Sequence, residues 1–150
     1  MKLVRKNGSE SDTPVYRDLA QCYFILNDYE NARKFIEMTG QEKENRFIVD
    51  LQIQIYLKEK NEEKAREKLS ILKNIDSPSY YLHRCSTVEY QFNHLNEAYK
   101  ASLAAVNADS RPSFEMLAQL VNCAIETGEH AVGLENLKIL DDRYRRGKRI

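Results

Sequence analysis

A small residue returns at a nearly constant interval along this chain, and that interval constrains the fold more than any other feature. Ala65 follows Ala32 by 33 residues, Ala98 follows Ala65 by the same interval, and Gly133 lies 35 residues beyond Ala98. A short turn-like segment precedes each of the four: Asn27-Asp28-Tyr29, Lys60-Asn61-Glu62, Asn93-His94-Leu95 and Thr127-Gly128-Glu129. A fixed period in the low thirties is typical of chains built from repeated helix pairs.

Apolar side chains recur at helical spacing on both sides of the first turn. Before it, one face of a helix expected over 14–26 carries Tyr16, Leu19, Ala20, Tyr23 and Phe24. After it, a helix expected over 29–38 carries Ala32, Phe35 and Ile36. Thr13 is the predicted N-cap with Pro14 at the first helical position, and Gly40 is the predicted C-terminal stop. The pattern predicts an all-α fold with two helices per repeat.

The four units resemble tetratricopeptide repeats. The first reads Tyr16-x-x-Leu19-Ala20-x-x-Tyr23, then Ala32-x-x-x-Ile36; the second reads Val49-x-x-Gln52-Ile53-x-x-Tyr56, then Ala65-x-x-x-Leu69. The third reads Leu82-x-x-Cys85-Ser86-x-x-Glu89, then Ala98-x-x-x-Ser102; the fourth reads Leu117-x-x-Leu120-Val121-x-x-Ala124, then Gly133-x-x-x-Leu137. The resemblance implies a right-handed α-solenoid, or superhelix, of about four antiparallel helix pairs. Its units are expected over 14–40, 45–77, 79–110 and 112–142, after a polar tail (1–13) and before a basic tail or linker (143–150).

Several packing expectations follow from this register. The repeated small residues should lie where helices approach closely, at axial separations of ~8–10 Å. Large residues should fill the gaps between units: Tyr23, Phe35, Ile36, Tyr56, Leu69, Leu72, Leu137 and Leu140. Ile53 and Val121 stand where the family prefers Gly or Ala, so helices there should sit farther apart. Cys85 is expected in the core and His83 in solvent, and Cys22 and Cys123 are expected to be small packing residues.

Composition excludes several classes of function. Lys plus Arg and Asp plus Glu are each 23, so overall charge favours neither nucleic acid nor an acidic membrane surface as a partner. The polar N-terminus does not resemble a signal peptide, and no apolar run approaches the roughly 20 residues of a membrane span. Three widely spaced cysteines indicate a reducing, cytoplasmic setting. No nucleophile elbow, P-loop or metal-ligand spacing occurs, so neither catalysis nor a cofactor or metal is expected.

A protein or peptide is the expected partner, because first helices of tetratricopeptide units line a concave groove that holds such a segment. By helix face, the predicted lining comprises Arg17, Gln21, Phe24, Asp50, Gln54, Leu57, Lys58, His83, Thr87, Tyr90, Gln91, Gln119 and Asn122. Amide and hydroxyl groups there suit an extended backbone, and aromatic rings suit a side chain. Arg17 and Gln21 partly imitate the carboxylate clamp of the family's chaperone-tail-binding members, but Asp50 would oppose a carboxylate.

The function predicted from these features is that of a scaffold or adaptor. The alternative is a self-associating or regulatory helical segment of a larger protein, such as a bacterial signalling or defence ATPase. That alternative depends on the last unit, where apolar residues occupy more than one helix face: Leu134, Leu137, Ile139 and Leu140. The expected cover is a following unit of a longer repeat array, with a second copy or a partner as the alternatives. The basic residues of 143–150 are interpreted as a solvated helix end or linker, with RNA or lipid contact as the alternative.

Overall fold

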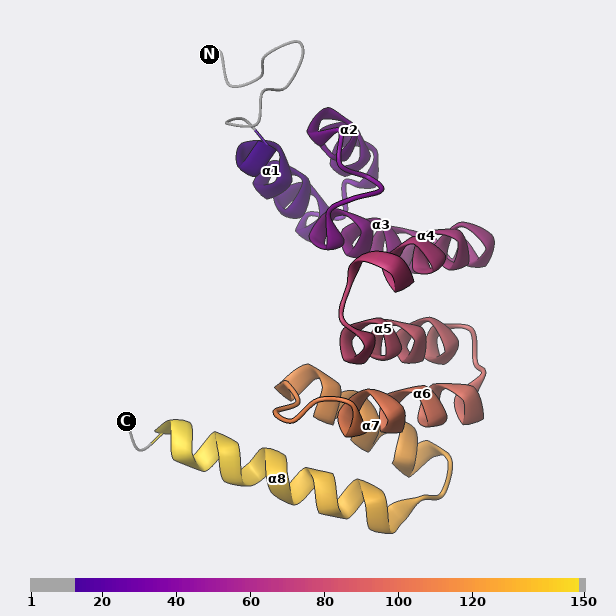
Figure 1. Cartoon of the computed structure of the whole chain (residues 1–150), viewed down its shortest axis with the longest axis vertical. Coiled ribbons are helices and arrows are strands. Elements are labelled where there is room, and N and C mark those ends of the chain that lie inside the picture. The colour runs from indigo at the N-terminus through magenta and orange to yellow at the C-terminus, as the bar shows by residue number, and fades with distance from the viewer. Residues whose placement is uncertain (1–12, 149–150) are drawn as a thin grey trace. The chain divides into compact units, whose positions relative to one another are not determined.

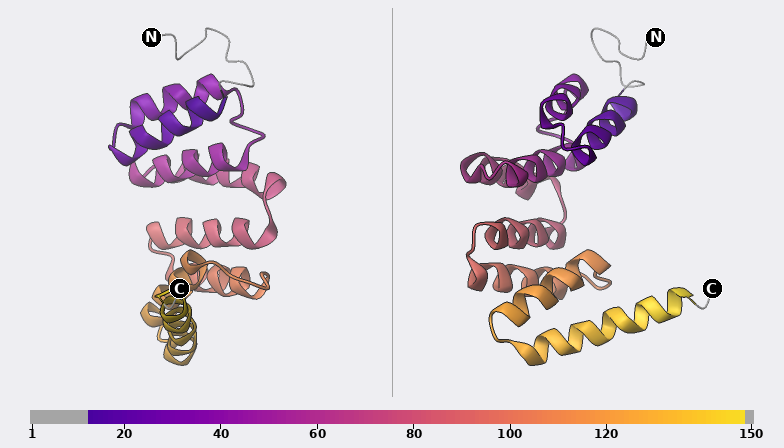
Figure 2. Two further views of the ribbon diagram at one scale, coloured as in Figure 1. Left: turned by 90° about the vertical axis from the view of Figure 1, so that its left-hand side faces the viewer. Right: turned by 180° about the vertical axis from the view of Figure 1, so that it is seen from behind.

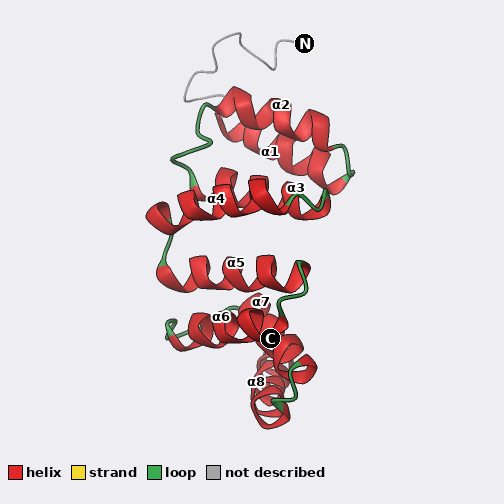
Figure 3. Cartoon of the chain, turned by 90° about the vertical axis from the view of Figure 1, so that its right-hand side faces the viewer, coloured by secondary structure: helices red, strands yellow, loops and turns green. Residues whose placement is uncertain are grey.

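The computed structural model describes residues 13–148, and every regular element in that range is an α-helix (Figures 1 and 3). The helices are α1 (Thr13–Ile25), α2 (Tyr29–Thr39), α3 (Arg46–Lys58), α4 (Glu62–Ile75), α5 (Pro78–Gln91), α6 (Leu95–Asn107), α7 (Phe114–Glu126) and α8 (His130–Lys148). The predicted all-α class is therefore confirmed.

The chain divides into two compact units, unit 1 (Met1–Ile75) and unit 2 (Asp76–Ile150). In unit 1, α1 pairs with α2 and α3 pairs with α4, and α3 also contacts both α1 and α2. Unit 2 follows the same plan: α5 pairs with α6, α7 pairs with α8, and α7 contacts both α5 and α6. The second pair of each unit thus packs its first helix against both helices of the pair before it (Figure 2).

All four helix pairs are joined by the same backbone turn. A residue in the left-handed region stands at its centre, namely Asn27 (φ 62°), Lys60 (φ 57°), Asn93 (φ 65°) and Gly128 (φ 84°). The next residue's N–H donates to the carbonyl five positions back, as from Asp28 to Tyr23 and from Glu129 to Ala124. This 6→1 bond is characteristic of the Schellman motif, which satisfies carbonyls at the end of a helix. The turns therefore hold the four pairs in one register.

Side-chain caps define several of the helix starts. Asp28, Asn45, Ser77 and Ser113 each accept a backbone N–H from the first turn of the helix that follows, which satisfies a donor that has no partner within the helix. α1 begins at Thr13 itself, so the predicted N-cap lies inside the helix. Gly40 ends α2 with φ 64°, as expected of a C-terminal glycine.

The core of unit 1 is built from aliphatic and aromatic side chains. One cluster of buried side chains comprises Ala20, Ala32, Ile36, Ile48, Leu51 and Ile55. Phe35 stacks between two tyrosines, with ring centroids 6.4 Å from Tyr16 and 5.6 Å from Tyr23. Such offset pairs add to the stabilisation from buried area alone. Ala32 and Ala65 are fully buried, which confirms that the small repeated residues face the interior.

The core of unit 2 is smaller in side-chain volume and partly polar. Ser86 is fully buried, and its hydroxyl donates to the carbonyl of Ala98 at 2.8 Å. Gln119 reaches in from α7 and donates to Ser86 Oγ at 3.1 Å. Burial raises the pKa of the Cys123 thiol above its ordinary value, so it stays protonated. Because Gly133 has no side chain, α8 can approach α7 closely, and an added Cβ would lie 3.4 Å from Ile125.

Three packing expectations are wrong. His83 is only 4% exposed, whereas Cys85 is half-buried, which reverses their predicted positions; a hydrogen bond with Cys85 raises the pKa of Tyr81 to about 12. Cys22 is exposed, although Cys123 at the same register is buried. Leu137 is 49% exposed and fills no gap within the described chain. Burial depends on which neighbouring helix covers a face, and a register position alone does not specify that neighbour.

The last helix runs farther than expected. The fourth unit was predicted to end at residue 142, but α8 continues to Lys148. Ion pairs one helical turn apart support this extension: Arg145 Nε lies 3.0 Å from Asp141 and Arg146 Nη2 lies 3.1 Å from Asp142. Such exposed i, i+4 pairs stabilise a helix by ~0.3–0.5 kcal/mol each. Residues 1–12 of the predicted polar tail, and Arg149 and Ile150, lie outside the described residues.

Candidate functional site

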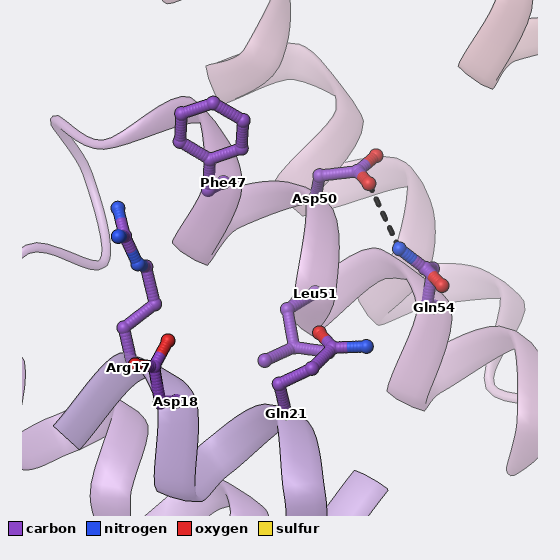
Figure 4. Close-up of a pocket in the computed structure, with 7 residues that line it drawn as sticks. All are labelled: Arg17, Asp18, Gln21, Phe47, Asp50, Leu51 and Gln54. Carbon is purple, nitrogen blue, oxygen red and sulfur yellow. Dashed lines mark hydrogen bonds between the residues drawn. The ribbon is translucent and has the colours of Figure 1, made fainter. Parts of the chain in front are cut away.

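The first helices of the two pairs in unit 1 form the walls of a hollow of about 330 Å³, here called the α1–α3 hollow (Figure 4). α1 contributes Arg17, Asp18 and Gln21, and α3 contributes Phe47, Asp50, Leu51 and Gln54. Four of these residues, Arg17, Gln21, Asp50 and Gln54, belong to the predicted groove lining. The contact of α3 with α1 brings them together on one face of unit 1.

Phe47 is the most conspicuous apolar group of the hollow. Phe47 is 57% exposed, although the next two residues of α3, Ile48 and Val49, are buried. Two guanidinium groups flank the ring: the Cζ atom of Arg17 lies 5.7 Å from the ring centroid and that of Arg46 lies 4.9 Å away. Cation–π attraction at these distances holds the ring and the charges in one place. The hollow thus carries an aromatic surface with positive charge beside it.

The remaining lining of the hollow is polar, with amide groups from both helices and the carboxylates of Asp18 and Asp50. Gln54 Nε2 donates to Asp50 Oδ2 at 2.8 Å, and Figure 4 shows this bond across one turn of α3. Asp50 is buried, Gln54 is half-buried and Gln21 on α1 is exposed. Each glutamine amide can both donate and accept, as a peptide backbone does. The negative charge of Asp50 would repel a carboxylate placed here.

The other predicted lining residues of unit 1 lie outside the hollow. Phe24 packs against the core and its ring centroid lies 5.9 Å from that of Tyr29. Leu57 is buried, and Lys58, at the last position of α3, is exposed. These three residues do not line the α1–α3 hollow.

In unit 2 the predicted lining residues occupy varied surroundings. His83 is buried with its ring centroid 5.8 Å from that of Tyr80. Thr87 is half-buried and donates to the Arg84 carbonyl at 2.9 Å. Gln119 turns inward to Ser86 and to Cys123 Sγ, 3.5 Å away. Gln91 and Asn122 are exposed.

Tyr90 links the first helices of the two pairs in unit 2. Its hydroxyl on α5 donates to Glu126 Oε1 on α7 at 2.5 Å. This hydrogen bond raises the pKa of Tyr90, since a carboxylate accepts from the neutral phenol and repels the phenolate. The predicted ligand-binding aromatic of unit 2 is therefore engaged within the unit, whereas Phe47 in unit 1 presents most of its surface.

Sequence reasoning missed Phe47, Asp18 and Leu51 as lining residues. No local signal separates Phe47 from the core, because Phe47 and Leu51 stand at i and i+4 and share one side of α3. Its exposure depends on which helices pack around α3, and the sequence pattern does not specify those neighbours.

A scan of protein-family models and a search of curated proteins find no match to this sequence. Among residues 13–148, no three His, Cys, Asp or Glu side chains gather where they could hold a metal ion. No helix in the described range combines the length and apolarity needed to cross a membrane.

Proposed function

We propose that this chain is a non-catalytic protein-interaction module of the tetratricopeptide type, whose helix pairs stack as a right-handed solenoid. Three observations support the repeat assignment: the shared left-handed turn, the buried small residues, and the packing of α3 and α7 against both helices of the preceding pair. No unit of this kind buries its apolar face alone, so stacking is the expected way to complete the core.

The partner in this proposal is an extended protein segment bound in the α1–α3 hollow. The exposed ring of Phe47, between Arg17 and Arg46, is the observation that carries the assignment. Arginine is enriched at interaction hot spots, and aromatic residues including phenylalanine are enriched at interface cores. The amides of Gln21 and Gln54 would pair with the backbone of the segment, while Phe47 and Leu51 would contact one of its side chains.

The test is site-specific photocrosslinking followed by binding measurements. A photoreactive phenylalanine analogue at position 47 should capture a partner in extracts of the native host, whereas the same analogue at Lys64, exposed on α4, should not. A peptide spanning the crosslinked segment should then lose affinity by about tenfold or more with Phe47→Ala or Gln54→Ala. Lys64→Glu serves as the matched surface control. Full binding by both hollow variants, with loss in the control, would contradict the assignment.

A second candidate function is self-association, in which this chain is a regulatory or assembly segment of a larger protein. Exposed apolar side chains on α8 favour it: Leu134, Leu137 and Ile139 all present more than a third of their surface. Light scattering should then give a dimer whose dissociation constant rises with Leu134→Glu, whereas Glu135→Lys on the same helix serves as the charge control. A monomer at all concentrations would exclude this candidate.

A further inference from the structure

A second hollow, of about 650 Å³, lies within unit 2 and is unusually rich in arginine. Its lining comprises Arg111, Pro112 and Ser113 from the loop after α6, Phe114 from the start of α7, and Arg143 and Arg146 from α8. Half of these six residues are arginines in a chain whose total charge is balanced. We call this feature the arginine hollow.

Positive charge in the arginine hollow is only partly compensated. Among residues 13–148, neither Arg111 nor Arg143 has a carboxylate within ion-pair distance, and only Arg146 of the three has one, from Asp142 at 3.1 Å. Two other arginines of the surface contrast with this: Arg33 lies 2.7 Å from Glu59, and Arg145 lies 3.0 Å from Asp141. Because the Arg146–Asp142 pair is exposed, it contributes little and a stronger anion can displace it.

The loop that presents Arg111 is held in place by several hydrogen bonds. The Arg111 N–H donates to Asp109 Oδ1 at 2.9 Å, and Asp109 Oδ2 accepts from the Ser79 hydroxyl of α5 at 3.3 Å. Arg143 donates to the carbonyl of Pro112, which ties the loop to α8. A guanidinium group has five N–H donors, so this single bond leaves Arg143 most of its capacity. The backbone of the loop and the position of Arg143 are therefore fixed before a ligand binds, which favours affinity.

Arginine side chains that converge on one hollow match the oxygens of a phosphate monoester. A phosphate on a side chain carries about −1.5 to −2 charge at neutral pH and offers three strong acceptor oxygens, and the planar guanidinium fork suits them. Phe114 is 54% exposed beside the arginines, so it can receive an apolar residue next to the phosphate. A single carboxylate would engage fewer of the available donors.

Acidic residues around the arginine hollow argue against an extended polyanion. Glu115 follows Phe114 directly, and Asp141 and Asp142 precede Arg143; all three are exposed. A nucleic-acid backbone or an acidic membrane surface would bring several further negative charges against these carboxylates. One compact dianion reaches the arginines without that repulsion. We propose that the arginine hollow binds a phosphorylated side chain of a partner protein, with a neighbouring apolar residue of the partner packed on Phe114.

The experiment is a titration of the whole chain, followed by amide chemical shifts in nuclear magnetic resonance. O-phosphoserine should produce saturable shifts at residues 109–114 and 143–146, whereas serine should not. Arg111→Gln should weaken binding about tenfold or more, because a charge-assisted hydrogen bond is lost. Arg145→Gln is the matched control: it removes the same charge from an exposed arginine that lies outside the hollow, and it should change binding less than about twofold.

The pH dependence of binding and a second variant, Arg143→Gln, sharpen the test. Binding should weaken as pH falls below about 6, since the second proton of a phosphate monoester binds there and removes one negative charge. Arg143→Gln is expected to weaken binding too, but it also removes the bond to Pro112. The conclusion about phosphate binding therefore rests on Arg111→Gln.

Several outcomes would overturn the proposal. One is an absence of saturable shifts at the hollow with O-phosphoserine. Another is equal binding of N-acetylglutamate, which would indicate a general anion surface. Binding of a single-stranded RNA oligomer or of phosphatidylserine vesicles that depends on Arg111, without binding of O-phosphoserine, would assign the surface to those ligands instead. Each result is independent of the α1–α3 hollow, which lies in the other unit.

Discussion

Units 1 and 2 use the same helix order and the same turn, yet their cores are filled differently. Ile36 and Leu69, four residues beyond the repeated alanines of unit 1, are both buried. At the corresponding positions of unit 2, Ser102 is buried but polar and Leu137 is 49% exposed. The hairpins nevertheless keep one register, because the left-handed turn and the small residue after it are local features. Hairpin geometry and core composition are therefore separate properties of this chain.

The largest expected change in stability is at the position four residues beyond the repeated small residue. Ile36→Ala should reduce the free energy of unfolding by about 2–5 kcal/mol, because it leaves a cavity in the aromatic and aliphatic core of unit 1. Leu137→Ala should cost no more than about 0.5 kcal/mol, because its side chain is half in solvent. Urea denaturation of both variants measures the difference. Equal losses would show that Leu137 is covered in solution and that the two units are filled alike.

Overpacking of the close helix crossing should have the next largest effect, and it should be similar in both units. Ala65→Leu and Ala98→Leu are each expected to cost about 1–3 kcal/mol, since both alanines are fully buried. Ala118→Leu, at an exposed position of α7, is the control and should leave the melting temperature nearly unchanged. An unchanged melting temperature for one of the buried variants would place that alanine outside a close crossing.

The polar core of unit 2 predicts a smaller loss of stability when a buried serine is replaced, and no such loss is expected for the exposed serine compared with it in unit 1. Ser86→Ala removes the donor to the Ala98 carbonyl and the acceptor for Gln119, and should cost about 1 kcal/mol. Ser70→Ala is the comparison in unit 1, where the exposed hydroxyl bonds only to the Glu67 carbonyl of its own helix; this change should be nearly neutral. A neutral Ser86→Ala would mean that the buried bonds contribute no net stability.

The smallest expected effects concern the shared turn. Gly128→Ala should cost about 1 kcal/mol, because alanine is strained at φ 84° although no atom lies near the added Cβ. Lys60→Gly should gain up to about 1 kcal/mol by relieving the same strain in unit 1. Thermal unfolding of the two single variants is the measurement. A gain in stability with Gly128→Ala, or a loss with Lys60→Gly, would show that the turns are not equivalent.

The helical class and the hairpin register could be predicted because they depend on short stretches of sequence. The positions of Ala32, Ala65, Ala98 and Gly133 relative to their turns were enough to place every helix pair. The family resemblance and the stacking of the pairs remain proposals, supported by that register.

The details of the candidate sites were harder to predict, since they depend on contacts between helices distant in sequence. Phe47 is exposed beside Arg17 only because α3 meets α1, and Gln119 is drawn inward only because Ser86 offers it a buried hydroxyl. From sequence, Arg143 and Arg146 are interpreted as part of a solvated helix end or linker. Their proximity to Arg111 could not be predicted, because Arg111 precedes Arg143 by 32 residues and nothing local links them.

The order in which helices touch also bears on how fast each unit can form. Among the described helices of both units, every helix–helix contact joins helices that are adjacent or next but one along the chain. Only short loops must close before a contact can form, so the entropic barrier to each step is small. Helical proteins with such low contact order fold in microseconds to milliseconds. A chain organised in this way can acquire its pairs one after another as it leaves the ribosome, without waiting for its C-terminal half.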